Sequence, residues 1–176
     1  MERILKLPFS EEDIQAINAG DQVLLSGTLY VGRDQVHKRL FEAIGKGQPL
    51  PFDFKGAAIY YMGPSPAPEG FVIGAAGPTT SARMDPFSPA LLDAGLRVMV
   101  GKGPRSESVR EAVVRDKGLY LQAYGGCGAL YGLAIKKKET IAYPELGPEA
   151  LLKLEVEDFP VFCILDSHGG AWNGSD

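Results

Sequence analysis

The fold is decided by a stretch in the middle of the chain, Phe71-Val-Ile-Gly-Ala-Ala-Gly-Pro-Thr-Thr-Ser-Ala-Arg-Met-Asp85, followed by the run Pro86-Phe-Ser-Pro-Ala-Leu-Leu-Asp-Ala-Gly95. The apolar residues 71–76 predict a buried strand, the Gly-Pro pair predicts a turn, and the run that ends at Gly95 predicts a helix. Such a turn places backbone N–H groups and the positive end of a helix dipole beside its own side chains. Because Thr79, Thr80 and Arg83 lie in this turn, the stretch predicts a site for an anion such as a carboxylate or a phosphate.

The same strand, turn and helix unit recurs along the chain and predicts an α/β fold. Residues 22–30 predict a strand before a helix over 34–44, and residues 96–100 predict a strand before a helix over 107–116. Further helices are expected at 11–19 and 129–135, the second ending in Lys136-Lys-Lys138, and further strands at 57–61, 119–123, 140–143, 150–156 and 161–165. A chain of 176 residues can bury a core without the help of disulfides or metal ions, so we expect a single domain over 1–176. Its polar tail, at about 167–176, is expected to be frayed.

The composition excludes several classes of protein. Hydrophobic residues make up 45% and charged residues 23% of the chain, and no apolar run approaches the ~20 residues of a membrane span. The amino terminus lacks a secretory signal, so we expect a cytoplasmic protein with no membrane partner. A net charge of −4 argues against nucleic-acid binding. The two cysteines, Cys127 and Cys163, form no CxxC pair and predict buried thiols rather than disulfides or a metal site.

Three turns carry cations at the ends of predicted strands, namely Gly32-Arg33-Asp34, residues 79–83 and Gly101-Lys102-Gly103. In an α/β sheet, ligands bind outside the carboxyl ends of the strands, so these turns are expected to converge on one crevice. Arginine can hold a carboxylate in a two-bond fork and lysine adds a compact charge. Arg33, Arg83 and Lys102 together therefore predict a site for a small diacid.

Plainer interpretations stay open for each of these features. A single loop cation is most often a solvated charge, and Gly101-Lys-Gly lacks the GxxxxGK[ST] pattern of a phosphate loop. The glycines of Gly125-Gly-Cys-Gly128 are typical of a tight turn without a ligand. Asp34 and His37, three residues apart, either form an acid/base pair or serve as a helix cap and a surface histidine. His168 is expected to be exposed in the tail.

Four motifs resemble, in this order, the beta component of class I fumarases and L-tartrate dehydratases: Gly27-Thr-Leu-Tyr-Val-Gly-Arg-Asp-Gln-Val-His-Lys-Arg39, Gly77-Pro-Thr-Thr-Ser-Ala-Arg-Met-Asp85, Val100-Gly-Lys-Gly103 and Val156-Glu-Asp-Phe-Pro-Val161. The resemblance covers nearly the whole chain. It implies a swivelling β/β/α three-layer domain and a hydro-lyase that reversibly adds water to a small dicarboxylate, such as fumarate to give malate.

The resemblance also implies roles for individual residues. Thr79 is the proton-transfer residue, Arg33, Arg83 and Lys102 bind the substrate carboxylates, and Asp34, His37 and Thr80 support them. An alcohol is a poor base without activation, and no activating carboxylate is identifiable beside Thr79, so we expect one from a partner chain.

By the same resemblance, an alpha subunit carries a [4Fe-4S] cluster and this chain carries no metal. Two cysteines cannot supply the three thiolates of such a cluster, so this chain is expected to be inactive without its alpha subunit. The expected assembly is a hetero-oligomer, with homodimerisation as a further option. Fumarate is the preferred substrate, and the alternatives are an L-tartrate dehydratase beta subunit or a non-catalytic dicarboxylate-binding module.

Overall fold

The computed structural model describes residues 2–63, 67–124 and 127–173. Its elements follow the chain in the order β1 (Glu2–Leu7), α1 (Glu11–Ala16), β2 (Gln22–Val31), α2 (Asp34–Gly45), β3 (Ala58–Tyr60), the 3-10 helix η1 (Ser81–Met84), α3 (Ser88–Asp93), β4 (Val98–Gly101), α4 (Glu107–Arg115), β5 (Leu119–Gln122), α5 (Gly128–Ala134), β6 (Ile135–Ala142), the 3-10 helix η2 (Pro144–Glu149) and β7 (Leu151–Leu165). The predicted α/β class is confirmed.

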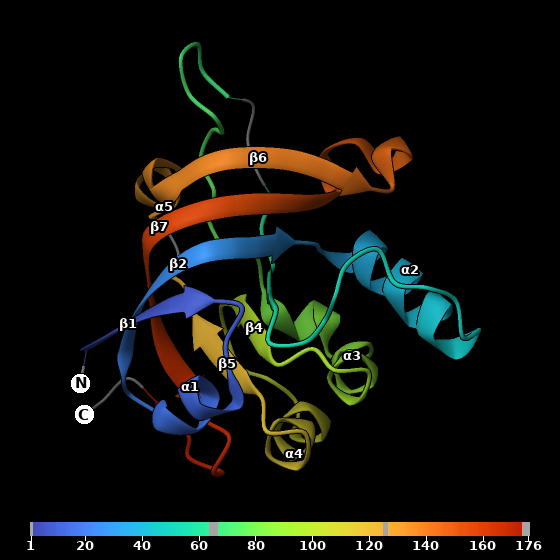
Figure 1. Ribbon diagram of the computed structural model, residues 1–176, viewed down its shortest axis with the longest axis vertical. Coiled ribbons are helices and arrows are strands. Elements are labelled where there is room, and N and C mark those ends of the chain that lie inside the picture. The colour runs from blue at the N-terminus through green and yellow to red at the C-terminus, as the bar shows by residue number, and fades with distance from the viewer. Residues whose placement is uncertain (1, 64–66, 125–126, 174–176) are drawn as a thin grey trace.

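Seven strands form one mixed sheet in the order β1-β2-β3-β4-β5-β7-β6 (Figure 1). Strands β1 to β5 are parallel neighbours, whereas β7 runs antiparallel to β5, β6 and β2. Since β7 pairs with both β5 and β2, the strands β2, β3, β4, β5 and β7 pair in a closed circuit. Strand β1 and strand β6 are left at the edges.

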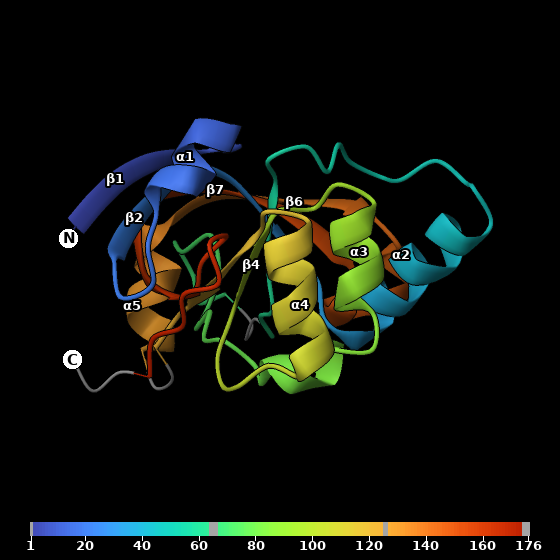
Figure 2. The ribbon, with the colours of Figure 1, turned by 90° about the horizontal axis from the view of Figure 1, so that it is seen from below.

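Alternate side chains of the short central strands face two separate cores, as the two-residue period of a strand requires. Ala58 and Tyr60 of β3 face an inner core enclosed by the strands, and Ile59 faces an outer core beneath the helices. Figures 1 and 2 show α2, α3 and α4 gathered over that outer face. On the other side, Tyr131 of α5 belongs to the inner core, and its hydroxyl donates to the carbonyl of Pro160 at 2.8 Å.

Local sequence explains where the helices begin. Ser10 caps α1 in a capping box, in which its hydroxyl accepts the Asp13 N–H and the Asp13 carboxylate accepts the Ser10 N–H. Ser106 caps α4 by accepting from the backbone of Val109. Helix α2 begins at Asp34 without a side-chain cap, directly after Arg33. Both α2 and α4 were predicted within two residues of their observed bounds.

The strand predicted over 71–76 is wrong. Phe71 and Val72 are 57% and 41% exposed, and only Ile73 and Ala76 of this run are buried. The run packs on α5 instead of joining the sheet, and the Ala76 N–H donates to the carbonyl of Gly128 at 2.9 Å. The glycines and the proline in 74–78 disfavour a regular strand here. The chain therefore reaches Thr79, beside the end of β3, through a loop.

Other expectations also need correction. The lysines at 136–138 lie in β6 rather than at a helix end, where their charges suit an exposed edge strand. The strands predicted at 150–156 and 161–165 are one strand of 15 residues, β7. The tail is not frayed over 167–173, because the Trp172 ring stacks on Phe162 and the Trp172 backbone N–H donates to the carbonyl of Ile164. Residues 125 and 126 of the predicted glycine turn lie outside the described residues.

Within the described residues, no helix is long and apolar enough to cross a membrane. A cavity of about 720 Å³ lies between α1, the loop over 50–56 and the amino ends of β3, β4 and β5. Phe9, Phe54, Arg97 and Lys117 are among the residues that line it. This cavity is at the edge of the sheet opposite to the predicted anion site.

Candidate active site

The carboxyl ends of three parallel strands form the edge on which the candidate site lies. Val31 at the end of β2 pairs with Tyr60 at the end of β3, which in turn pairs with Val100 of β4. The three strands therefore end side by side. Arg33 follows β2 and Lys102 follows β4, so these two turns lie at the same edge of the sheet.

Residues 78–81 lie across the ends of β3 and β4. Pro78 forms a bridge with Met62, and the Thr79 N–H donates to the carbonyl of Tyr61 at 2.8 Å. Thr80 pairs with Lys102, and the Ser81 N–H donates to the carbonyl of Lys102 at 2.9 Å. The backbone thus places Thr79 next to the end of β3 and Thr80 next to Lys102. Thr79 is half-buried and Thr80 is exposed.

Arg83 reaches the first residue of α2. Its Nε and Nη2 atoms donate to Oδ2 of Asp34 at 3.1 and 2.6 Å. The side chains of Arg83 and Asp34 are 49% and 35% exposed. An ion pair this open to water contributes about 0–1 kcal/mol, so an anionic ligand can compete with Asp34 for the guanidinium.

Arg33 is more enclosed than Arg83. Its Nη2 atom lies 3.2 Å from Oε1 of Glu149, and its side chain is 25% exposed. Its Nη1 atom lies 2.7 Å from the position that a Cβ atom on Gly63 would occupy, so the guanidinium packs closely against the backbone of Gly63. The Nε atom of Arg33 is buried and has no hydrogen-bond partner among the described residues. Arg33 therefore keeps an unsatisfied donor beside the edge.

Asp34 and His37 do not form an acid/base pair. Asp34 binds Arg83, while the buried His37 ring lies 2.8 Å through Nδ1 from the carbonyl of Arg33 and packs edge-on against Tyr61. A carbonyl can only accept, so Nδ1 carries the ring proton. Burial lowers the pKa of His37 to about 4, outweighing its bond to Arg33. A neutral His37 that holds the backbone before α2 fits the predicted supporting role rather than proton transfer.

The cations differ in how they are paired. Arg33 and Arg83 contact Glu149 and Asp34, whereas Lys102 forms no ion pair within the described part of the chain. Glu149 belongs to η2, far from the predicted motifs in sequence, and no sequence signal pointed to it. Two of the three cations at this edge are therefore paired with carboxylates of the chain itself.

The residues of this chain do not fit an iron-sulfur cluster. Cys163 is buried in β7, its thiol contacts the carbonyl of Leu165 at 3.5 Å, and burial raises the pKa of the thiol far above its usual range. Cys127 is half-buried at the start of α5. Among the described residues, no three His, Cys, Asp or Glu side chains gather in a way that could hold a metal ion.

The fold and the site together define a class of protein. It is an α/β domain with cationic turns along the carboxyl edge of its parallel strands. The family model "Fumarase C-terminus" matches residues 2–173, and the chain belongs to this family.

Named relatives fall into two groups. The chain is 41% identical over 169 residues to "Fumarate hydratase class I, aerobic" of Salmonella typhimurium, covering 94% of this chain and 29% of that protein. It is 45% identical over 147 residues to "Fumarate hydratase class I, anaerobic" of Escherichia coli, covering 82% and 27%. It is 35% identical over 174 residues to "L(+)-tartrate dehydratase subunit beta" of Escherichia coli, covering 96% and 85%. The chain thus spans less than a third of these fumarate hydratases and most of the tartrate dehydratase subunit.

Proposed function

We propose that this chain is the beta component of a two-component hydro-lyase that reversibly hydrates a small dicarboxylate, with fumarate and malate preferred. The observation that carries the proposal is the convergence of Arg33, Arg83 and Lys102 on the edge that the Thr79 turn crosses, in a chain of the fumarase C-terminus family. A four-carbon diacid needs cations at both ends, and this edge offers them from three different turns.

The three cations are expected to bind the substrate carboxylates and to stabilise the negative charge that develops during the reaction. Hydration of fumarate adds hydroxide to one carbon and a proton to the other, and the negative charge that develops spreads into the carboxylate next to the protonated carbon. Guanidinium and ammonium groups aimed at those oxygens stabilise this charge, and one well-placed donor is worth ~3 kcal/mol. Arg33 is the best prepared of the three, since its Nε donor is buried without a described partner.

Thr79 is proposed to transfer the proton. In the direction of hydration its hydroxyl gives a proton to the substrate carbon, and in the direction of dehydration it takes that proton back. The group that activates the Thr79 hydroxyl is proposed to come from another chain. The addition of hydroxide to the other carbon, and its removal in the reverse direction, are likewise assigned to the partner chain.

The partner is proposed to be an alpha subunit that carries the [4Fe-4S] cluster. Most of the length of the fumarate hydratases lies outside the match, whereas the tartrate dehydratase relative is itself a subunit beta covered to 85%. The cysteines of this chain do not fit a cluster, so no step of the reaction is assigned to a metal on this chain. We expect a hetero-oligomer that is inactive when the alpha subunit is missing.

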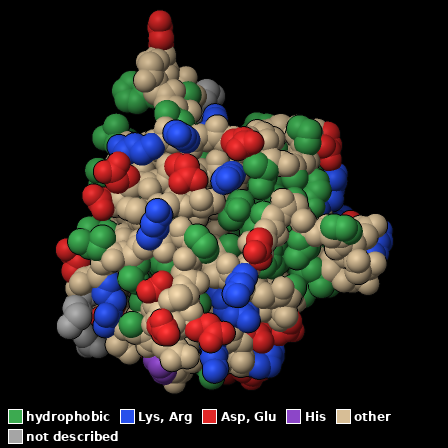
Figure 3. All heavy atoms as spheres, viewed as in Figure 1, with side chains coloured by type: hydrophobic (Ala, Val, Ile, Leu, Met, Phe, Trp, Pro, Cys, Tyr) green, Lys and Arg blue, Asp and Glu red, His purple; other side chains and the backbone are tan. Residues whose placement is uncertain are grey.

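We propose that the alpha subunit covers an apolar surface made by the exposed side chains of Phe71, Val72, Leu130 and Leu133. Phe71, Leu130 and Leu133 are 57%, 58% and 58% exposed there. Figure 3 shows hydrophobic side chains on the segment that projects from the top of the molecule. The Ala76 N–H donates to the carbonyl of Gly128 and so links the segment after Val72 to α5. Ala76 is three residues before Thr79. A partner seated on this surface therefore borders the candidate active site.

Two finer points accompany the proposal. The swivelling β/β/α layering is supported by the two cores, one enclosed by strands and one between the central strands and α2, α3 and α4. A cytoplasmic location is supported by the free thiols of Cys127 and Cys163.

A panel of substrates separates the proposal from its alternatives. The chain is combined anaerobically with the alpha component of the same genome and offered fumarate, L-malate and L-tartrate, and each diacid is also titrated into the chain alone by calorimetry. Turnover of fumarate and malate is expected. Turnover of tartrate alone identifies a tartrate dehydratase, and diacid binding without any turnover identifies a binding module.

A further inference from the structure

Arg105 carries a charge into the outer core, directly behind the candidate site. Its side chain is fully buried, although it lies only three residues after Lys102 in the turn between β4 and α4. A buried charge is costly unless it is paired and hydrogen-bonded, so its partners identify what it holds in place. Nε donates to Oδ1 of Asp85 at 2.7 Å, and Nη2 donates to the hydroxyls of Ser88 and Tyr61 at 2.9 and 3.3 Å.

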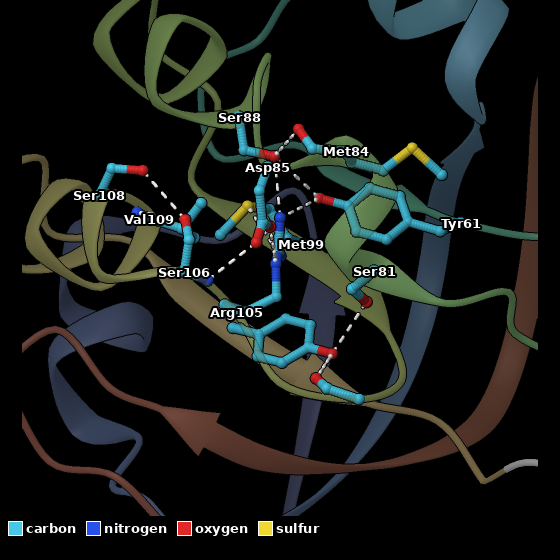
Figure 4. A network of polar contacts seen from close by, with 12 residues as sticks. Tyr61, Ser81, Met84, Asp85, Ser88, Met99, Arg105, Ser106, Ser108 and Val109 are labelled. Atoms are coloured by element: carbon cyan, nitrogen blue, oxygen red, sulfur yellow. Dashed lines mark hydrogen bonds and ion pairs between the residues drawn. The ribbon is translucent and has the colours of Figure 1, made fainter.

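These contacts tie the turn of Arg83 to the turn of Lys102. Asp85 directly follows η1, the 3-10 helix that contains Arg83, and its second oxygen accepts the Ser106 N–H at 2.8 Å. Both oxygens of Asp85 are thus held by the segment that follows Lys102. The guanidinium also lies over two aromatic rings, 5.3 Å from the centre of Tyr61 and 4.8 Å from that of Tyr120. Figure 4 shows Arg105 beside Asp85, Ser88 and Tyr61.

Tyr120 of β5 makes a second tie between the same turns. Its hydroxyl donates to the carbonyl of Gly103 at 2.7 Å and lies 2.8 Å from Oγ of Ser81. The single proton of the tyrosine is used on Gly103, so the Ser81 hydroxyl must donate to Tyr120. Ser81 is two residues from Thr79, and Gly103 is next to Lys102. One hydroxyl group therefore joins the segment of the proposed proton-transfer residue to the segment of a proposed carboxylate ligand.

We propose that Arg105 and Tyr120 are positioning residues that fix the turn of Thr79 and Arg83 relative to Lys102. The inference rests on the proposed function for its effect on turnover, but the positioning itself is a property of this chain alone. Neither residue is placed to touch a substrate, because both are buried under the edge. Misplacement of reacting groups by about 1 Å can lower a rate about 100-fold, so small shifts of these turns matter.

Tyr120→Phe tests the proposal with a matched control, Tyr131→Phe. Both tyrosines are fully buried, burial raises the pKa of each to about 12, and each hydroxyl makes two hydrogen bonds. Only the bonds of Tyr120 join the site turns, since Tyr131 contacts Tyr124 and Pro160. Both variants are expected to fold. The denaturant concentration at the midpoint of unfolding is expected to fall by a similar amount in each.

The first readout is turnover in the complex with the alpha subunit. Tyr120→Phe is expected to lower kcat at least about tenfold while KM changes less than about threefold, and Tyr131→Phe is expected to leave both near wild type. Arg105→Lys, which keeps the charge but not the fork, is expected to show the same split with a kcat between those of Arg105→Met and wild type. Equal kcat losses in the two tyrosine variants overturn the proposal.

The second readout does not depend on turnover. Amide hydrogen exchange of the isolated chain, followed by NMR, is expected to be at least about tenfold faster at Ser81 in Tyr120→Phe than in wild type, and unchanged there in Tyr131→Phe. If the wild-type complex turns over no diacid but Ser81 exchange responds as expected, the proposed function fails and the positioning stands. Unchanged exchange at Ser81 in Tyr120→Phe overturns the positioning even if the complex is an active enzyme.

Discussion

At the scale of single residues, the site contrasts two arginine and aspartate pairs. Arg83 and Asp34 meet at an exposed edge, where water weakens their attraction. Arg105 and Asp85 meet with the guanidinium fully buried, where each depends on the other. Breaking the exposed pair costs little, whereas breaking the buried pair leaves an uncompensated charge in the core. The same residue types therefore serve recognition in one place and rigidity in the other.

His37 predicts a pH dependence of stability at this scale. Its pKa in the folded chain is about 4, below the ordinary value of 6.5, because burial disfavours the charged ring. The unfolded chain binds the proton more readily, so the contribution of neutral His37 is full above pH 6.5 and is lost as the pH falls toward 4. We expect a loss of about 2 kcal/mol from this group between pH 7 and pH 4.5.

Urea unfolding of wild type and His37→Asn at the two pH values measures this loss. The asparagine amide can still donate to the carbonyl of Arg33 but does not titrate. The variant is expected to lose less stability than wild type on acidification, whatever its stability at pH 7. Identical losses in both proteins would show that His37 is not the titrating group.

At the scale of elements, close packing behind the turns sets the geometry of the edge. A Cβ atom on Gly101, the last residue of β4, would clash with Oγ of Ser81 and lie 2.7 Å from the ring of Tyr61. Gly101→Ala is therefore expected to cost about 1–3 kcal/mol and to push Ser81 away from Lys102. A lower kcat of the complex should accompany the loss.

Gly45→Ala in α2 is the matched control, because nothing lies within 4 Å of the added carbon and alanine favours a helix. Thermal unfolding and steady-state kinetics of both variants check the prediction. It is contradicted if Gly101→Ala is as stable and as active as Gly45→Ala.

The same scale shows what the sequence could and could not predict. The amphipathic spacing in α2 and α4 and the order of β2, β3, β4 and β5 follow from local patterns, and with them the common edge of Arg33 and Lys102. The apolar run 71–76 was misassigned because a short apolar segment looks alike in a strand and in a loop that packs on a helix. Strand β1 was missed, and β7 was split, because pairing partners are distant in sequence. Nothing in the local sequence separates Arg105 from a solvated loop cation.

At the scale of the whole molecule, the apolar surface of Phe71, Val72, Leu130 and Leu133 predicts where the alpha subunit binds. Leu133→Asp places a charge on this surface and is expected to raise the Kd of the complex at least about tenfold. Val114→Asp on α4 is the control, since Val114 is 46% exposed away from this surface. Analytical ultracentrifugation of each variant with the alpha subunit measures the difference. Equal affinities would place the interface elsewhere.

The central claim is that the edge of Thr79, Arg33, Arg83 and Lys102 is this chain's half of a diacid hydratase active site. The most direct test is fumarate hydration by the anaerobically assembled complex, measured for wild type, Thr79→Val and Arg83→Met, with diacid affinity determined in parallel. Turnover by wild type is expected, together with loss of at least about 100-fold in kcat but little affinity in Thr79→Val, and a strong loss of affinity in Arg83→Met. An inactive wild-type complex, or equal losses of affinity and rate in both variants, would contradict the account.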